Sequence, residues 1–351
     1  MLVLSKARKI IKTLVLGDTV APEELATGIP DPQSEIAVWL HGMGRPIDVT
    51  YRQSTACSSP FRICVAFPPE RVPTPTQLNR LKLKFCERNG LALLLGEIGL
   101  KWTQTLSLGE LTLCVFAARS ATNYCLPKRT LYPYYLRHLY RTWTNASASS
   151  HMPMSFLERR AAMVSFIRPH PTVLGSTMDD LGSNLFPMNI MGMLGDSHFG
   201  FALRDDRFAS HLVERAGRLV LSNVPMPEAS IAYGLAVNHT KTAIRWEELP
   251  FATQPSPLFK IPAPVFAQRI RELQVENVHR IGSHTFFVAR ILRDESYSTN
   301  PVLCVIHGYY QEWRLKGRPG DLKASMAEDA INKRGKPAYA RSTEQYRHDQ
   351  R

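Results

Sequence analysis

The stretch His198–Pro225, "HFGFALRDDRFASHLVERAGRLVLSNVP", decides the fold that this sequence predicts. Residues 198–204 and 218–225 are apolar runs that predict strands. Between them, residues 205–217 predict a short helix that ends at Gly217. Further short strands on both sides of this unit favour a Greek-key barrel over a series of βαβ units.

The rest of the chain predicts more strands than helices. Strands are expected at 35–42, 60–68, 91–99, 110–120, 172–177, 284–292 and 302–313. Helices are expected over 228–240 and over 74–90, the latter capped by Thr74 or Thr76 and ended by Asn89-Gly90. No internal sequence repeat is evident. The expected class is therefore α+β or mainly β, with a barrel preceded by a smaller α+β domain.

The length of 351 residues suggests two domains. The small polar segment 144–153 is the best linker, so we expect a domain of unknown role over 1–145, a barrel over 146–313 and a tail over 314–351. The net charge of +13 is uneven, because residues 146–313 carry 15 basic and 15 acidic side chains. The positive charge lies in the first domain and the tail. No nucleic-acid motif accompanies it, which argues against a nucleic-acid partner.

The six cysteines form no C-x-x-C pair and lie mostly in apolar surroundings, which favours a reducing, cytoplasmic location. The histidines show no metal-ligand spacing, so no metal is expected. Residues 1–17 lack the pattern of a secretory signal. No apolar run approaches the ~20 residues that span a bilayer.

The segment Gly175–Gly192, "GSTMDDLGSNLFPMNIMG", predicts a cofactor site next to the barrel strands. Its Phe-Pro-Met cluster fits poorly in a helix or strand, and it offers a rigid apolar surface for a flat ring. An arginine where a strand meets a helix favours a phosphate. The expected cofactor-binding residues are Ser176, Thr177, Asn184, Phe186, Pro187, Met188, Arg207, Ser210 and Asn223. His284, at the start of a strand, is the expected catalytic residue, facing the ring or a nicotinamide.

Three pieces in this order resemble the flavin reductase-like, FMN-binding split-barrel family: "RPHPTVLGST…GSNLFPMN", "RFASHLVERAGRLVLSNVP" and "IGSHTFFVARIL". The resemblance covers about Phe156–Trp313. Arg207, Asn223 and His284 match family positions, whereas Ala209 stands where threonine is common, and Ser210 is a substitute. The resemblance implies a homodimer with FMN, or FAD, near the subunit interface. It also implies NAD(P)H as hydride donor and a partner monooxygenase or small-molecule acceptor.

Two functions remain open from the sequence. The first is an FMN-binding oxidoreductase, either an NAD(P)H-dependent flavin reductase or an enzyme that uses bound FMN on another substrate. The second is a non-catalytic protein that binds flavin or another flat cofactor, while its basic N-terminal domain binds a partner. Five site residues also have a structural alternative: Asn184 in a turn, Phe186 and Met188 in a core, Arg207 in a surface ion pair, and His284 as a hydrogen-bonded strand histidine.

Overall fold

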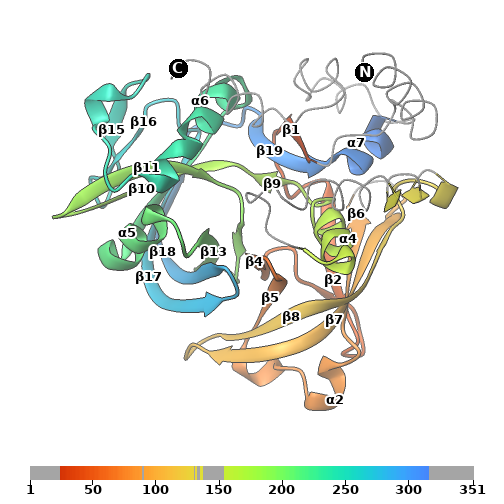
Figure 1. The fold of residues 1–351 in the computed structure, drawn as a ribbon. Coiled ribbons are helices and arrows are strands. Elements are labelled where there is room, and N and C mark those ends of the chain that lie inside the picture. Colours follow the sequence, from red (N-terminus) through yellow and green to blue (C-terminus); the bar gives the residue numbers. More distant parts are fainter. Residues whose placement is uncertain (1–23, 89–90, 130, 133–134, 137–153, 316–351) are drawn as a thin grey trace, which may run out of the picture.

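The structure is a computed structural model that describes residues 24–88, 91–129, 131–132, 135–136 and 154–315 (Figure 1). The expected linker at 144–153, the N-terminal segment 1–17 and the tail beyond Leu315 lie outside these residues. We call residues 24–136 the first half and residues 154–315 the second half. Each half contains one large antiparallel sheet, and Figure 1 shows the first in orange and the second in green to blue.

The sheet of the first half has seven strands in the order β3-β2-β6-β7-β8-β5-β4. They are β2 (Ile36–His41), β3 (Ile47–Asp48), β4 (Gln53–Ser58), β5 (Phe61–Phe67), β6 (Lys82–Glu87), β7 (Leu94–Ser107) and β8 (Thr112–Asn123). The 3-10 helix η1 (Pro69–Arg71) and the short helix α2 (Pro75–Leu78) connect β5 to β6.

The sheet of the second half also has seven strands, in the order β11-β10-β14-β17-β18-β13-β12. They are β10 (Val173–Asp179), β11 (Gly182–Met188), β12 (Met191–Met193), β13 (His198–Arg204), β14 (Arg218–Asn223), β17 (Arg269–Ile281) and β18 (His284–Ser296). Helix α5 (Phe208–Ala216) connects β13 to β14, and Gly217 ends it in the left-handed conformation, which glycine adopts without strain.

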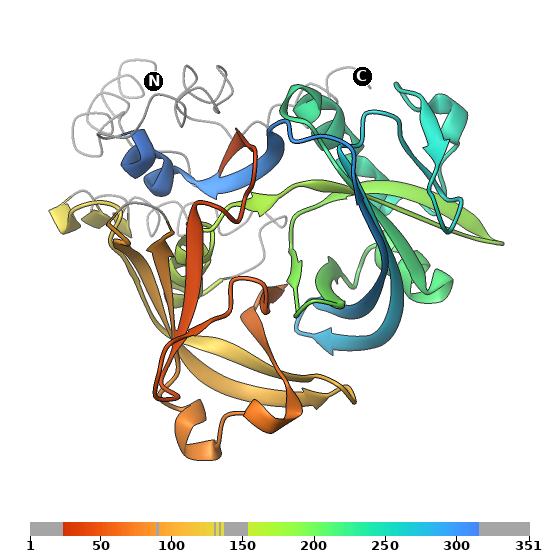
Figure 2. The same cartoon turned by 180° about the vertical axis from the view of Figure 1, so that it is seen from behind.

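The remaining elements surround these two sheets. A small sheet has the order β1-β19-β9, so that β19 lies between the strands that precede each large sheet (Figure 2). Its strands are β1 (Glu24–Ile29), β9 (His170–Pro171) and β19 (Val302–His307). The others are α4 (Phe156–Ser165), η2 (Met226–Glu228), α6 (Ala229–Gly234), η3 (Leu235–Thr240), η4 (Trp246–Glu248), β15 (Thr253–Pro255), β16 (Pro262–Pro264) and α7 (Gly308–Leu315). No helix in these described ranges has the length and apolarity to cross a bilayer.

The two halves share a buried apolar core between their large sheets. It contains residues on or next to β4, β5 and β8 of the first half and β12, β13, β17 and β18 of the second: Ala56, Cys57, Cys64, Ala66, Leu111, Leu113, Val115, Leu194, Ala202, Ile281, Phe286 and Val288. The close approach of β12 to β4 requires glycine at position 192 on β12, because a Cβ on Gly192 would collide with the backbone oxygen of Gln53. An isolated antiparallel bridge also joins Arg52 to Leu194. The halves therefore pack as one body.

The mainly β prediction is confirmed, and so are strands at 36–41, 61–67, 198–204 and 218–223 and the helix that ends at Gly217. The helix expected over 74–90 is wrong beyond Leu78. Residues 82–87 alternate between half-buried and buried side chains, and a strand satisfies that alternation whereas a helix does not.

Two further expectations need correction. The Phe-Pro-Met cluster does lie in a strand, β11, which is the edge strand of its sheet. An edge strand accommodates Pro187, because proline has no N–H to donate to a further strand. Residues 302–313 are a strand only as far as His307, after which α7 begins at Gly308.

Candidate functional site

A hollow of about 600 Å³ opens between the two halves, within the size range of sites for small ligands and cofactors. The first half contributes Thr55, Ser58 and Phe61 from the β4–β5 hairpin. From the second half come residues at the ends of β11, β13 and β18, together with η3 and α4. The complete lining is Thr55, Ser58, Phe61, Met154, Arg159, Ala162, Met163, Phe166, His170, Pro187, Met188, Asn189, Ile190, Ala202, Leu203, Arg204, Arg207, Ala236, His239, Thr240, His284 and His307.

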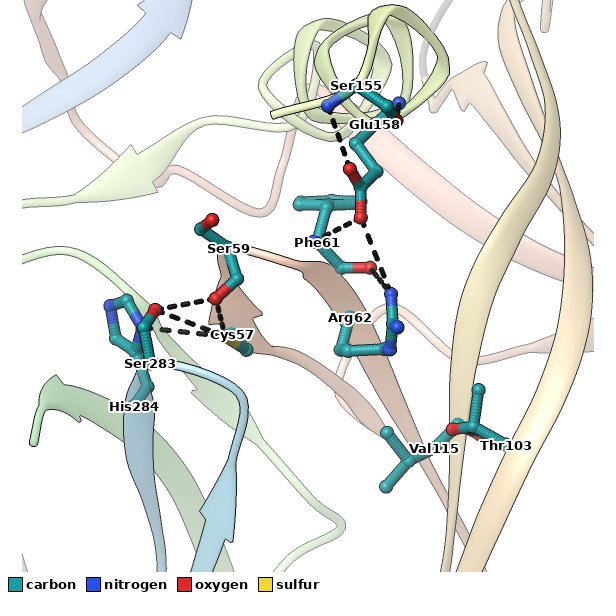
Figure 3. A network of polar contacts seen from close by, with 10 residues as sticks. All are labelled: Cys57, Ser59, Phe61, Arg62, Thr103, Val115, Ser155, Glu158, Ser283 and His284. Carbon is teal, nitrogen blue, oxygen red and sulfur yellow. Dashed lines mark hydrogen bonds and ion pairs between the residues drawn. The ribbon is translucent and has the colours of Figure 1, made fainter. Parts of the chain in front are cut away.

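Helix α4 is held against the first half by Glu158. Ser155 caps the helix in a capping box with Glu158, and the same carboxylate accepts a hydrogen bond of 3.1 Å from the Phe61 N–H (Figure 3). Arg62 lies 3.6 Å from the carboxylate as an ion pair. Glu158 therefore couples two walls of the hollow, the β5 wall that carries Phe61 and the α4 wall that carries Met163.

The charge of the hollow is positive. Three arginines line it, Arg159, Arg204 and Arg207, and none of its described lining residues is acidic. Asp206 lies just outside the lining and offsets part of this charge, since it accepts hydrogen bonds of 2.9 and 2.6 Å from Arg204 and lies 3.3 Å from Arg207. The positive charge that remains on the arginines favours an anionic ligand.

His284 is buried at the contact between the halves. Its Nδ1 lies 2.9 Å from Ser283 Oγ and 3.5 Å from Cys57 Sγ (Figure 3). Its Nε2 lies 3.4 Å from Ser58 Oγ. Burial, followed by the charge of Arg204, lowers the pKa of His284 to about 4. The imidazole is therefore neutral at neutral pH.

The contacts of Ser283 assign the tautomer of His284. The Ser283 hydroxyl donates its only proton to the carbonyl oxygen of Ser59, at 2.6 Å. It can therefore only accept from His284, which places the ring proton on Nδ1 and leaves a lone pair on Nε2. Nε2 lies on the side of Ser58, which lines the hollow. His284 can thus accept a hydrogen bond from Ser58 or from a bound ligand.

Two more histidines in the lining are also kept neutral by burial. Burial and the charge of Arg168 lower the pKa of His170 to about 4. Burial also lowers the pKa of His239, whose Nε2 lies 2.8 Å from the carbonyl oxygen of Pro187. Since a carbonyl only accepts, His239 carries its proton on Nε2 and is fixed against β11. No group of potential ligands for a metal ion occurs among the residues that the structure describes.

The structure brings together four of the ten sequence-predicted site residues. Pro187 and Met188 form part of an apolar wall, Arg207 lies at the start of α5, and His284 lies at the start of β18. Phe186 is just behind this wall, fully buried, with its ring centroid 4.9 Å from that of His239. His284 comes from β18, which is far from the other residues in the sequence.

The other predicted residues do not line the hollow. Thr177 donates to the carbonyl oxygen of Arg218, and Asn184 donates to the carbonyl oxygens of Asn238 and Lys241, which anchors η3 to β11. Ser176 and Ser210 are fully buried, and Asn223 lies in β14 opposite Val173. None of these five residues lines the hollow, and their contact with a cofactor stays a prediction.

Several lining residues escaped sequence analysis. Arg204 is the last residue of the strand predicted over 198–204, and Asn189 lies within the segment 175–192, so their position at strand ends was the signal that could have found them. Ser58, Arg159 and His307 had none, because they belong to elements that only the fold brings to the site.

Comparisons with known proteins give matches among solved structures alone. No protein-family model matches the chain, and no curated protein matches it. The chain is similar to an FMN-binding protein from Thermus thermophilus with bound 1-cyclohex-2-enone, at 21% identity over 37% of this chain and 71% of that one, with a TM-score of 0.32.

It is also similar to an NADH:FAD oxidoreductase from Streptomyces globisporus, at 10% identity over 43% of this chain and 89% of that one, with a TM-score of 0.37. The flavin reductase component of a bacterial two-component tryptophan halogenase is similar at 15% identity over 43% of this chain and 94% of that one, with a TM-score of 0.38. Flavin reductases and FMN-binding proteins are thus the solved structures that this chain is similar to, each over less than half of its length.

Proposed function

We propose that the hollow binds FMN and that the protein is an FMN-dependent oxidoreductase. The observation that supports this most is the combination of three arginines with an apolar wall in one hollow of suitable size. A flavin mononucleotide needs both, because it joins a phosphate to a flat, largely apolar ring.

The residues fit this group in two regions. Arg204 and Arg207, on the loop that leads into α5, would hold the phosphate, and the first N–H groups of α5 add to the positive potential there. Pro187, Met188 and Ile190 would face the ring. When bound, FMN supplies hydride-accepting chemistry at N5.

The protein's own side chains orient and shield the ligand rather than exchange protons with it. With a pKa of about 4, His284 is a neutral imidazole at neutral pH and does not act as a general acid, and its Nε2 lone pair is an acceptor that fixes the orientation of a ligand N–H or O–H. Phe61, Met163 and Phe166 exclude water from the opposite wall. We further propose NAD(P)H as the hydride donor, since hydride transfer requires orientation more than acid-base catalysis.

The test is a titration of the purified chain with FMN, followed by flavin fluorescence. We expect FMN to bind more tightly than riboflavin, which lacks the phosphate, by about 10-fold or more. The variant Arg207→Gln should remove most of this difference and leave riboflavin affinity unchanged. Equal affinities for the two flavins, or no binding of either, would reject FMN as the ligand.

A second measurement separates turnover from binding alone. Oxidation of NAD(P)H in air, catalysed by the FMN-loaded protein, would support the oxidoreductase. A protein that binds FMN and shows no turnover with either nicotinamide would instead be a flavin-binding protein without this activity.

A further inference from the structure

The two large sheets have the same topology, strand for strand. In each half the first two strands form a hairpin at one edge of the sheet, the next two form a hairpin at the other edge, a helical connection follows, and the last three fill the centre. The order β3-β2-β6-β7-β8-β5-β4 thus corresponds to β11-β10-β14-β17-β18-β13-β12 without exception. The helical connection is α2 in the first half and α5 in the second.

The flanking elements repeat this correspondence. β1 precedes the first sheet and β9 precedes the second, and the two pair with opposite edges of β19. The halves also contact each other through corresponding strands. The pairs Cys64–Val115 and Ala66–Leu113 on β5 and β8 face the shared core, as do Gly200–Val288 and Ala202–Phe286 on β13 and β18.

We propose that this chain is a fused duplication of one barrel unit, in which the contact between its own halves takes the place of a subunit interface and forms a single ligand site. The ligand identity in this inference rests on the proposed function. The site is complete within one chain, because the first half supplies Thr55, Ser58 and Phe61 and the second half supplies Arg204, Arg207 and His284.

The corresponding position in the first half lacks the chemistry of the site. Side chains alternate along a strand, so the next pair on the core-facing side of β13 and β18 is Arg204–His284. In the first half the next positions on that side are Pro68, just after β5, and Leu111, just before β8. A guanidinium and an imidazole are thus replaced by two apolar groups, which cannot bind an anion.

One basic residue does persist at the corresponding position. Arg207 follows Arg204 by three residues, and Arg71 follows Pro68 by three residues. Arg71 is exposed in η1, so it provides a matched control for Arg207. A protein with two equivalent sites would need both arginines, whereas a protein with one site needs Arg207 alone.

The test combines light scattering with an FMN titration of the full chain and of two variants. We expect the mass of one chain, one FMN per chain, and an increase in Kd of about 10-fold or more for Arg207→Glu. Arg71→Glu should keep the wild-type affinity and stoichiometry. Two FMN per chain, or a halved stoichiometry in Arg71→Glu, would overturn the single site.

The mass measurement tests the fusion independently of the ligand. A stable dimer of chains would overturn the inference that the halves replace two subunits, whatever the flavin result. If the wild-type chain binds no FMN, the proposed function fails, and a mass of one chain would still support the fused pair.

Discussion

Ser58 and His284 lie 226 residues apart in the sequence, yet Ser58 Oγ is 3.4 Å from His284 Nε2. The contact joins the β4–β5 hairpin of the first half to the start of β18 in the second. Both residues line the hollow, so this part of the candidate site exists only when the two halves are packed together.

Filling the hollow from the first half should abolish ligand binding. We expect Ser58→Trp to raise the Kd for FMN by about 10-fold or more, because the indole occupies volume that the ligand needs. Flavin fluorescence measures the affinity, and circular dichroism checks the fold. Ser107→Trp, at an exposed position on β7 away from the hollow, is the control. Unchanged affinity in Ser58→Trp would place the ligand elsewhere.

The buried histidines predict a loss of stability in mild acid. His170 and His284 have a pKa of about 4 in the folded protein and about 6.5 when unfolded. At pH values between these two pKa values, the two histidines bind protons in the unfolded chain and not in the folded chain. The free energy of unfolding therefore falls by up to about 1.4 kcal/mol per pH unit for each histidine as the pH drops from 6.5 to 4.

Urea unfolding at several pH values across this window measures that slope. His170→Gln and His284→Gln should each reduce it, even where they lower stability at neutral pH. A slope that neither substitution changes would show that other groups cause the acid sensitivity.

Removal of Glu158 should loosen α4 from the first half. Glu158→Ala loses the capping box and leaves the Phe61 N–H without its acceptor, which should cost about 2 kcal/mol of unfolding free energy. Glu158→Gln retains an acceptor and should cost less than half of that. The exposed Glu247→Ala serves as the control, with no expected change. Thermal unfolding distinguishes the three, and equal effects of Ala and Gln would contradict the capping role.

The contact between the halves should not tolerate a methyl group at Gly192. The Cβ of Gly192→Ala would collide with the backbone oxygen of Gln53 and push β12 from β4, at a cost of at least about 2 kcal/mol. Gly234→Ala in α6 has no atom within 4 Å of the new Cβ and should stabilise the protein by about 0.5–1 kcal/mol. Denaturant unfolding compares the two, and similar values for both would show that the contact can shift freely.

Local sequence determined the strands and the parts of the site that lie at strand ends. Pro187 and Arg207, which lie near the ends of predicted strands, line the hollow, and their contact with a cofactor stays a prediction. Alternating or continuous apolar runs predicted β2, β5, β13 and β14, which the structure confirms. These predictions succeed because strand formation and helix ends depend on a few neighbouring residues. The helix expected over 74–90 failed because two apolar periods overlapped there, and burial of Leu83 and Phe85 decided between them.

Only the tertiary structure decided which of the predicted residues share a site. The Asn184 amide is a group that could contact a ligand, but in the fold it donates to the backbone carbonyl oxygens of Asn238 and Lys241. Ser58 and Arg159 had no local signal and yet line the hollow. The common topology of the halves was equally invisible, because many apolar sequences satisfy the same pleated, half-buried surface. Strand order and contact between distant segments depend on which faces are buried together, and no short stretch of sequence contains that information.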